Sequence, residues 1–208
     1  MKRIAVIALM LVFVFGQSVK AQDKEFRFTL KTNPLAAMGG PIWVLFIPVT
    51  GEYKVMFEAR TTKHQSIETG LSYLGPSLFL NLDELSERDT IDGVNTHGFR
   101  AQVMYKFFLT RDQLAPEGFY VGPHLSYAKA RIANRDNPDD EFTAAKLNAN
   151  VVFGYQLITP GGFTLNVYTG LGLKLRDYDL PEDSSFDFDY GNRVTPNVAF
   201  GFTFGFAF

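Results

Sequence analysis

The chain has 208 residues, with 20 Lys and Arg, 22 Asp and Glu, and no Cys. Without Cys it forms no disulfide and carries no cysteine-linked lipid, so stability must come from backbone pairing and packing. The formal net charge of −2 excludes a strongly basic, nucleic-acid-binding surface.

The first 21 residues have the three parts of a signal peptide. Residues 1–3 are basic, residues 4–15 are apolar, and the Val-Lys-Ala sequence at 19–21 is a small-x-small cleavage motif. The apolar run is shorter than the ~20 residues that a membrane-spanning helix needs. We therefore expect export and cleavage after Ala21, which leaves residues 22–208 as one domain.

The remainder of the chain repeatedly alternates apolar and polar residues with a period of two, which is typical of β-strands. Many of these segments approach the ~9–11 residues with which a tilted strand crosses a membrane. The pattern predicts eight strands, at about residues 26–35, 49–60, 65–74, 99–107, 119–127, 146–157, 163–176 and 198–208.

The last of these segments has the clearest pattern. In residues 198–208 every second residue is Val or Phe, and the residues between them are only Ala, Gly or Thr. One face of this strand is therefore apolar and the other is small and uncharged, which suits a strand between lipid and a crowded barrel interior. The predicted fold is all-β: an eight-stranded antiparallel up-and-down transmembrane β-barrel.

The predicted connections alternate in length. Short turns are expected at 61–64, 110–118 and 159–162, and longer loops at 36–48, 75–97, 132–142 and 178–193. In outer-membrane barrels the short turns are periplasmic and the long loops are external. A soluble eight-stranded barrel of the lipocalin kind is the alternative fold, with its apolar face turned inward.

The predicted inward faces contain many charges. The interior of an eight-stranded barrel is just wide enough to be filled by side chains, and buried charges there must be paired. We therefore expect a structural ion-pair network that blocks the lumen, with a gated ion path through the same residues as the alternative. Its expected members are Glu52, Lys54, Glu58, Glu68, Arg100, Lys106, Lys146 and Lys174.

Several segments resemble the small outer-membrane β-barrels of the OmpA-like superfamily: the signal peptide, residues 31–35, 118–123 and 154–156, and the Phe-rich last strand. The resemblance implies an outer-membrane location, contact with outer-membrane lipid and lipopolysaccharide, and insertion by the barrel-assembly machinery. Phe204, Phe206 and Phe208 are the expected assembly signal. The peptidoglycan-binding domain of full-length OmpA has no counterpart in this sequence, so a cell-wall tether is not expected.

An enzymatic alternative comes from His124, Ser126 and Glu141. Their order is similar to the His-x-Ser and downstream Glu of outer-membrane lipid A deacylases, and a Ser activated by a carboxylate-oriented His is sound hydrolytic chemistry. In those enzymes, however, the His and Ser face lipid, whereas here the alternation places both inside. Tyr127 also replaces the Asn that usually follows the Ser. The main hypothesis is therefore a non-enzymatic barrel with a structural or surface-interaction role.

No metal or cofactor is expected. His64 and His97 have no ligand-like spacing to a partner, and the acidic residues at 136–141 and 177–189 match no known calcium loop. The apolar run at 42–47 is expected to extend a strand. A position in the membrane interface and contact with an apolar ligand or partner are the alternatives for that run.

Overall fold

The computed structural model describes residues 25–37, 50–76, 94–110, 114–134, 141–179 and 194–208. The predicted signal peptide, the apolar run at 42–47 and most of the acidic loop residues lie outside these ranges. The strands are β1 (Phe28–Thr32), β2 (Thr50–Thr62), β3 (Gln65–Pro76), β4 (Val94–Phe108), β5 (Gly118–Asn134), β6 (Glu141–Ile158), β7 (Phe163–Asp179) and β8 (Val194–Ala207). One short helix, α2 (Pro34–Ala37), follows β1.

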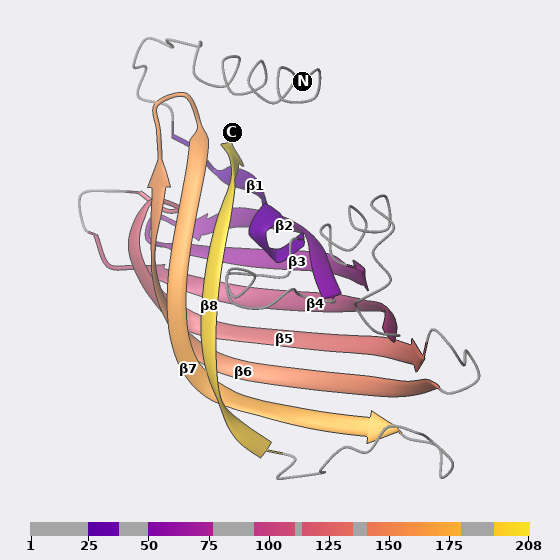
Figure 1. The fold of residues 1–208 in the computed structure, drawn as a ribbon. Helices are drawn as coiled ribbons and strands as arrows, with labels where there is room; N and C mark the ends of the chain where they lie inside the picture. Colours follow the sequence, from indigo (N-terminus) through magenta and orange to yellow (C-terminus); the bar gives the residue numbers. More distant parts are fainter. Residues whose placement is uncertain (1–24, 38–49, 77–93, 111–113, 135–140, 180–193) are drawn as a thin grey trace, which may run out of the picture.

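The eight strands form one antiparallel sheet, which confirms the predicted all-β class and strand number. Each strand pairs with its neighbours in sequence, and β8 also pairs with β1, so the strand order is that of a closed barrel (Figure 1). Within the described residues, no helix is long and apolar enough to cross a membrane.

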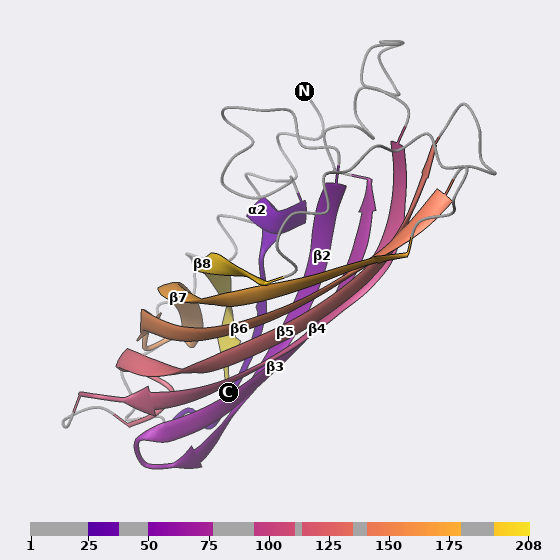
Figure 2. The same ribbon diagram turned by 90° about the horizontal axis from the view of Figure 1, so that it is seen from below.

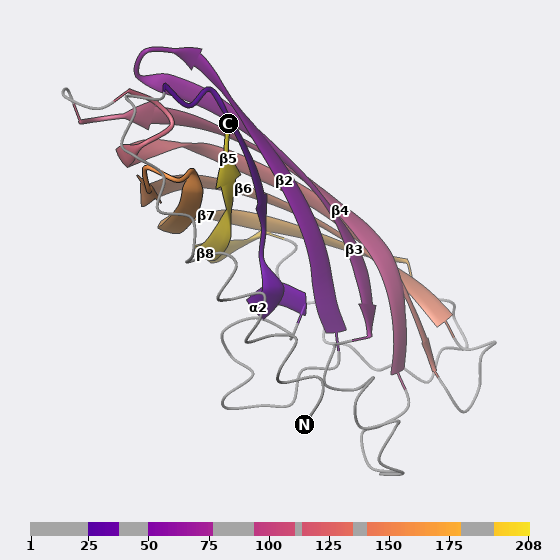
Figure 3. The same cartoon turned by 90° about the horizontal axis from the view of Figure 1, so that it is seen from above.

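The two ends of the sheet differ. One end, here called the turn end, holds residues 63–64, 109–110, 114–117 and 159–162 together with residues 207–208. The opposite end, called the loop end, holds α2 and the first residues of β2. Figures 2 and 3 show α2 at the far end of the sheet from the turn between β2 and β3.

The first predicted strand is too long. The alternation predicts a strand over residues 26–35, but β1 ends at Thr32 and α2 begins at Pro34. Proline suits the first position of a helix because it lacks the N–H that would have no partner there. Asn33 caps the same turn, since its Oδ1 and carbonyl oxygen accept from the Ala36 N–H at 3.1 and 3.2 Å.

Most of the later strands are longer at the loop end than their alternation predicts. β4 begins at Val94 instead of about Phe99, and β6 begins at Glu141 instead of about Lys146. Pairing between β5 and β6 continues without a break to Ala133 and Glu141. Backbone pairing with a neighbour thus extends a strand through residues whose side chains do not alternate in polarity.

The two faces of the sheet have opposite character. At the centre of β6, Val151 is 63% exposed on the outer face, whereas its neighbour Asn150 is buried at 6% on the inner face. In β8, Gly201 is buried and Phe202 is partly exposed, in agreement with the alternation. One apolar cluster packs in the interior, and its buried members are Met104, Phe108, Ala115, Tyr120, Val152 and Tyr168.

Gly201 makes room for one of these aromatic rings. A Cβ at residue 201 would lie 2.1 Å from the Cε1 and Cζ atoms of Tyr168. Glycine in a strand often marks such a close approach. A buried Tyr on β7 therefore requires the absence of a side chain at its cross-strand partner on β8.

We predict that Gly201→Ala lowers the free energy of unfolding by about 1–3 kcal/mol, because Tyr168 must leave its position. Gly161→Ala is the matched control. A Cβ there would meet only the Thr159 Oγ1, at 4.0 Å, so its effect should stay within about 0.5 kcal/mol. Urea unfolding followed by circular dichroism measures both, and equal effects would contradict the packing argument.

Candidate functional site in the barrel interior

Four charged side chains meet in the turn-end half of the lumen. Lys31 Nζ lies 2.5 Å from carboxylate oxygens of both Glu58 and Glu68, and Lys106 Nζ lies 3.2 Å from Glu58 and 2.6 Å from Glu68. Each carboxylate therefore contacts both ammonium groups. All four side chains are completely buried. We call this neutral group of two Lys and two Glu the turn-end cluster.

Gln156 links the turn-end cluster to the other side of the barrel. Its Oε1 accepts hydrogen bonds from Lys31 at 2.9 Å and from Lys106 at 3.1 Å. Its Nε2 donates to Glu58 at 2.9 Å and to the Pro116 carbonyl at 2.6 Å. Because β1 to β4 supply the charges and β6 supplies Gln156, the network spans the lumen from wall to wall.

Hydroxyl and aromatic side chains complete the surroundings of the cluster. Ser66 and Thr29 donate to Glu58 at 2.5 and 3.3 Å. The Lys106 ammonium lies 4.8 Å from the centre of the Tyr120 ring, within the range of a cation–π contact. The charged side chains of the cluster therefore have no solvent exposure and are surrounded by packed and hydrogen-bonded groups.

A second charged group, the loop-end cluster, lies nearer to α2. It consists of Glu52, Lys54, Arg100 and Lys146. Glu52 lies 3.1 Å from Lys54, pairs with Arg100, and accepts from Ser72 at 2.7 Å. Lys146 forms no ion pair with any described residue. The loop-end cluster thus contains three cations and one carboxylate, in contrast to the neutral turn-end cluster.

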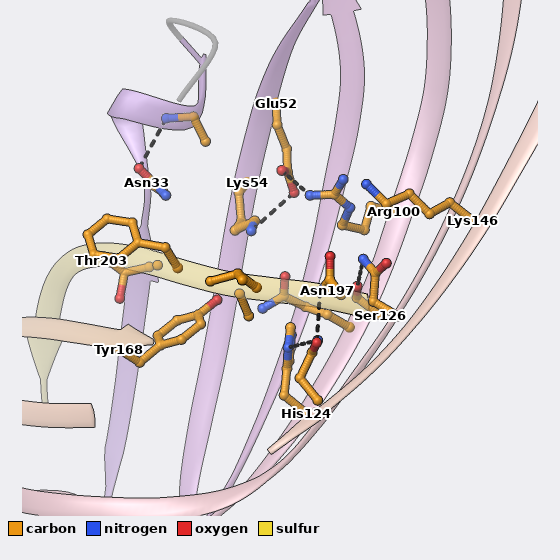
Figure 4. A pocket seen from close by; sticks show the side chains of 18 residues that line it. Asn33, Glu52, Lys54, Arg100, His124, Ser126, Lys146, Tyr168, Asn197 and Thr203 are labelled. Carbon is orange, nitrogen blue, oxygen red and sulfur yellow. Dashed lines mark hydrogen bonds and ion pairs between the residues drawn. The ribbon is translucent and has the colours of Figure 1, made fainter. Parts of the chain in front are cut away.

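The loop-end cluster borders a cavity of about 250 Å³. Figure 4 shows Glu52, Lys54, Arg100 and Lys146 along one side of this cavity, and His124 and Tyr168 on the other. Asn33 and Ala36, at the start of α2, also line it. The Arg100 side chain is 23% exposed, so part of it reaches solvent.

Amides and a hydroxyl group also line the cavity. Asn197 donates to Asn150 at 2.7 Å, and Asn148 donates to Ser126 at 3.1 Å. Three buried polar atoms at this cavity have no hydrogen-bond partner within the described residues. They are Arg100 Nε, His124 Nε2 and Asn148 Oδ1.

The three residues of the predicted hydrolytic set are not brought together. His124 Nδ1 faces Asn150 Nδ2 at 3.4 Å, His124 Nε2 has no partner, and Ser126 accepts from Asn148. Glu141 pairs with Arg131 near the loop end instead of orienting His124. His124 and Ser126 both lie on the inner face, as their alternation predicts.

The structure divides seven of the eight predicted lumen charges between the two clusters. Glu58, Glu68 and Lys106 lie in the turn-end cluster, and four others form the loop-end cluster. Lys174 is only partly buried and does not line the cavity. Lys31 and Gln156 are not among the predicted lumen residues, although both fall on polar faces of their strands.

The other candidate residues lie near the ends of strands. His64 is exposed in the turn after β2, and the His97 Nδ1 lies 2.5 Å from the Tyr73 hydroxyl. No group of three His, Asp or Glu in the described part of the chain has the arrangement of a metal site. In the predicted assembly signal, Phe206 and Phe208 are exposed, and Phe204 is partly exposed.

Comparisons with known proteins identify no relative: no family model matches the sequence, and no curated protein or solved structure gives a significant match.

We predict that Lys31→Met lowers the free energy of unfolding by about 3–5 kcal/mol, because it leaves two buried carboxylates with one ammonium group. The double substitution Lys31→Met with Glu68→Gln should cost less than the sum of the two single substitutions, since it restores charge balance.

Glu25→Gln is the control for the loss of an ion pair. Glu25 is 58% exposed and pairs with Arg60 at 3.0 Å, so the change should cost less than about 1 kcal/mol. Chemical unfolding of the four variants checks the prediction. Additive single and double effects would show that the turn-end cluster does not act as a unit.

Proposed function

We propose that this protein is an outer-membrane β-barrel with a closed lumen and a structural or surface-interaction role, without enzymatic activity. The observation that supports the proposal is the polarity of the sheet. Large apolar side chains are exposed on every strand, whereas Lys, Glu, Gln and Asn are buried inside. A soluble barrel would have the opposite arrangement, with apolar residues inside and charged residues in water.

The extent of the apolar outer surface strengthens this argument. Exposed Leu, Val, Phe and Tyr side chains occur on all eight strands, including Leu71 at 70%, Leu171 at 70% and Val198 at 72%. A soluble monomer rarely exposes one continuous apolar patch of more than a few hundred Å². A lipid bilayer is the environment in which a closed sheet with this surface is stable.

The turn-end cluster supports the non-porous part of the proposal. A transmembrane route through the lumen must pass Lys31, Glu58, Glu68, Lys106 and Gln156, which are fully buried and bonded to one another across the barrel. Opening such a route requires the separation of several buried ion pairs, each of which is costly to break. The principal partners are therefore lipid and lipopolysaccharide on the outer surface. Recognition of Phe204, Phe206 and Phe208 by assembly machinery stays a prediction.

The acyl-hydrolase alternative has weaker support from the geometry. A nucleophilic Ser needs a base within hydrogen-bond reach, whereas Ser126 is bonded to Asn148 and neither His124 nitrogen is bonded to Ser126. Both residues also lie inside the sheet, away from the outer surface that acyl chains would contact. Loss of a lipid A acyl chain that depends on Ser126, measured by mass spectrometry, would reverse this choice.

The membrane proposal predicts a strong effect of a charge at the centre of the outer surface. Val151→Arg should lower the free energy of unfolding in lipid vesicles by roughly 2–4 kcal/mol, the cost of an Arg at the midplane of a bilayer. Val151 is 63% exposed, so a soluble barrel would tolerate the same change with little effect.

Leu109→Arg is the matched control. Leu109 is similarly exposed, at 56%, but it lies just beyond β4 at the turn end, where an Arg should cost roughly 0–1 kcal/mol. Folding titrations in vesicles compare the two variants. Equal, small effects would contradict insertion of this surface in a membrane.

A closed lumen predicts that the protein does not conduct ions across a bilayer. Protein reconstituted in a planar bilayer should show no steady single-channel conductance at moderate voltage and neutral pH, because the turn-end cluster leaves no water-filled path. A long-lived open channel in the unmodified protein would contradict the closed-lumen part of the proposal and leave the membrane part standing.

A further inference from the structure

The loop-end cavity has an excess of positive charge that the rest of the interior lacks. Of the described residues, Lys54, Arg100 and Lys146 line it with only Glu52 to balance them. In the turn-end cluster, by contrast, two Lys face two Glu in direct contact. Burying unbalanced charge is costly, so two unneutralised cations beside a cavity indicate a site that an anion would stabilise.

Unpartnered polar atoms at the same cavity show where a ligand would bind. Within the described part of the chain, Arg100 Nε is a buried donor without an acceptor, and Asn148 Oδ1 is a buried acceptor without a donor. His124 is only 6% exposed, and its Nε2 has no partner among the same residues. Buried polar atoms are nearly always paired in native proteins. A ligand that has both a hydrogen-bond acceptor and a hydroxyl donor would therefore provide partners for these three atoms.

We propose that the loop-end cavity binds a small phosphate monoester that also bears hydroxyl groups, such as a phosphorylated polyol. The phosphate would lie against Arg100 and Lys146, and the hydroxyl groups against Asn148 and His124. This inference goes beyond the proposed function and depends on the closed sheet alone, since the same cavity would exist in a barrel that never enters a membrane.

Charge and size both favour this class of ligand. A phosphate monoester has a charge of about −1.5 to −2 at neutral pH, which matches the excess of two cations. The Arg guanidinium suits the geometry of phosphate oxygens, and charge-assisted hydrogen bonds of this kind are strong. A volume of about 250 Å³ lies just below the usual range for drug-sized ligands. The ligand is water-soluble because the cavity is inside the sheet, whereas lipid headgroups would border its outer surface.

Calorimetry with folded protein in a zwitterionic, phosphate-free detergent tests the proposal, with glycerol 3-phosphate as the probe. We expect saturable binding of one equivalent, weaker binding of inorganic phosphate, and none of glycerol. Absence of saturable binding would overturn the proposal. Equal affinity for inorganic phosphate would overturn its hydroxyl-binding part.

Two substitutions locate the site. Lys146→Gln should weaken the binding of glycerol 3-phosphate by about tenfold or more, which is the effect of losing one hydrogen bond to a charged group. Lys146 has no ion pair among the described residues and is partly exposed, so this variant should fold. Asn148→Asp, a change of almost no volume, should weaken binding by placing a carboxylate beside the ligand.

Lys174→Gln is the matched control. Lys174 faces Asn148 across the β6–β7 pair but does not line the cavity. The Lys174→Gln variant should bind glycerol 3-phosphate with an affinity within about twofold of that of the unmodified protein, because a partly exposed charge outside the cavity is screened. If Lys174→Gln weakens binding as much as Lys146→Gln, diffuse positive potential explains the binding and the proposal is overturned. Circular dichroism verifies that each variant is folded.

Discussion

The mutual neutralisation of Lys31, Glu58, Glu68 and Lys106 is the interaction on which the closed sheet depends. Closure places side chains from neighbouring strands in a space that water does not reach, where an unpaired charge would cost several kcal/mol. Each of the two carboxylates contacts both ammonium groups, so removing any member leaves its partners buried and unbalanced. The cluster is therefore satisfied only when β1, β2, β3 and β4 have their observed register.

The same cluster helps to explain how the sheet closes through its shortest strand. β1 has five residues, yet it must pair with β2 on one side and β8 on the other. Gly205 permits this approach, since a Cβ there would lie 1.8 Å from the Leu30 carbonyl oxygen. The Phe208 carbonyl then accepts from the Arg27 and Phe28 N–H groups. Lys31 adds side-chain bonds to β2, β3 and β6, which a five-residue ladder alone does not supply.

The sequence predicts the strands and their faces because alternation is a local property of the chain. It does not predict α2, where the proline geometry at Pro34 overrides an apolar pattern, or the loop-end extensions, which depend on backbone pairing with a neighbour. The partners of Lys31 cannot be predicted from the local sequence for a different reason. Gln156 is 125 residues away, and only closure of the sheet brings β1 opposite β6. The deacylase-like set shows the reverse case, in which suitable residues in sequence do not meet in space.

The lumen therefore separates two physical roles along its length. At the turn end the charges balance and the polar atoms are largely paired, although the Glu68 Oε1 has no partner within the described residues. At the loop end the charges do not balance, and donors and acceptors remain unpaired around a cavity. Stability favours the first arrangement, and binding requires the second, because a site whose groups already satisfy one another has little to gain from a ligand. An eight-stranded barrel is too narrow to mix the two, and here they occupy opposite ends of one interior.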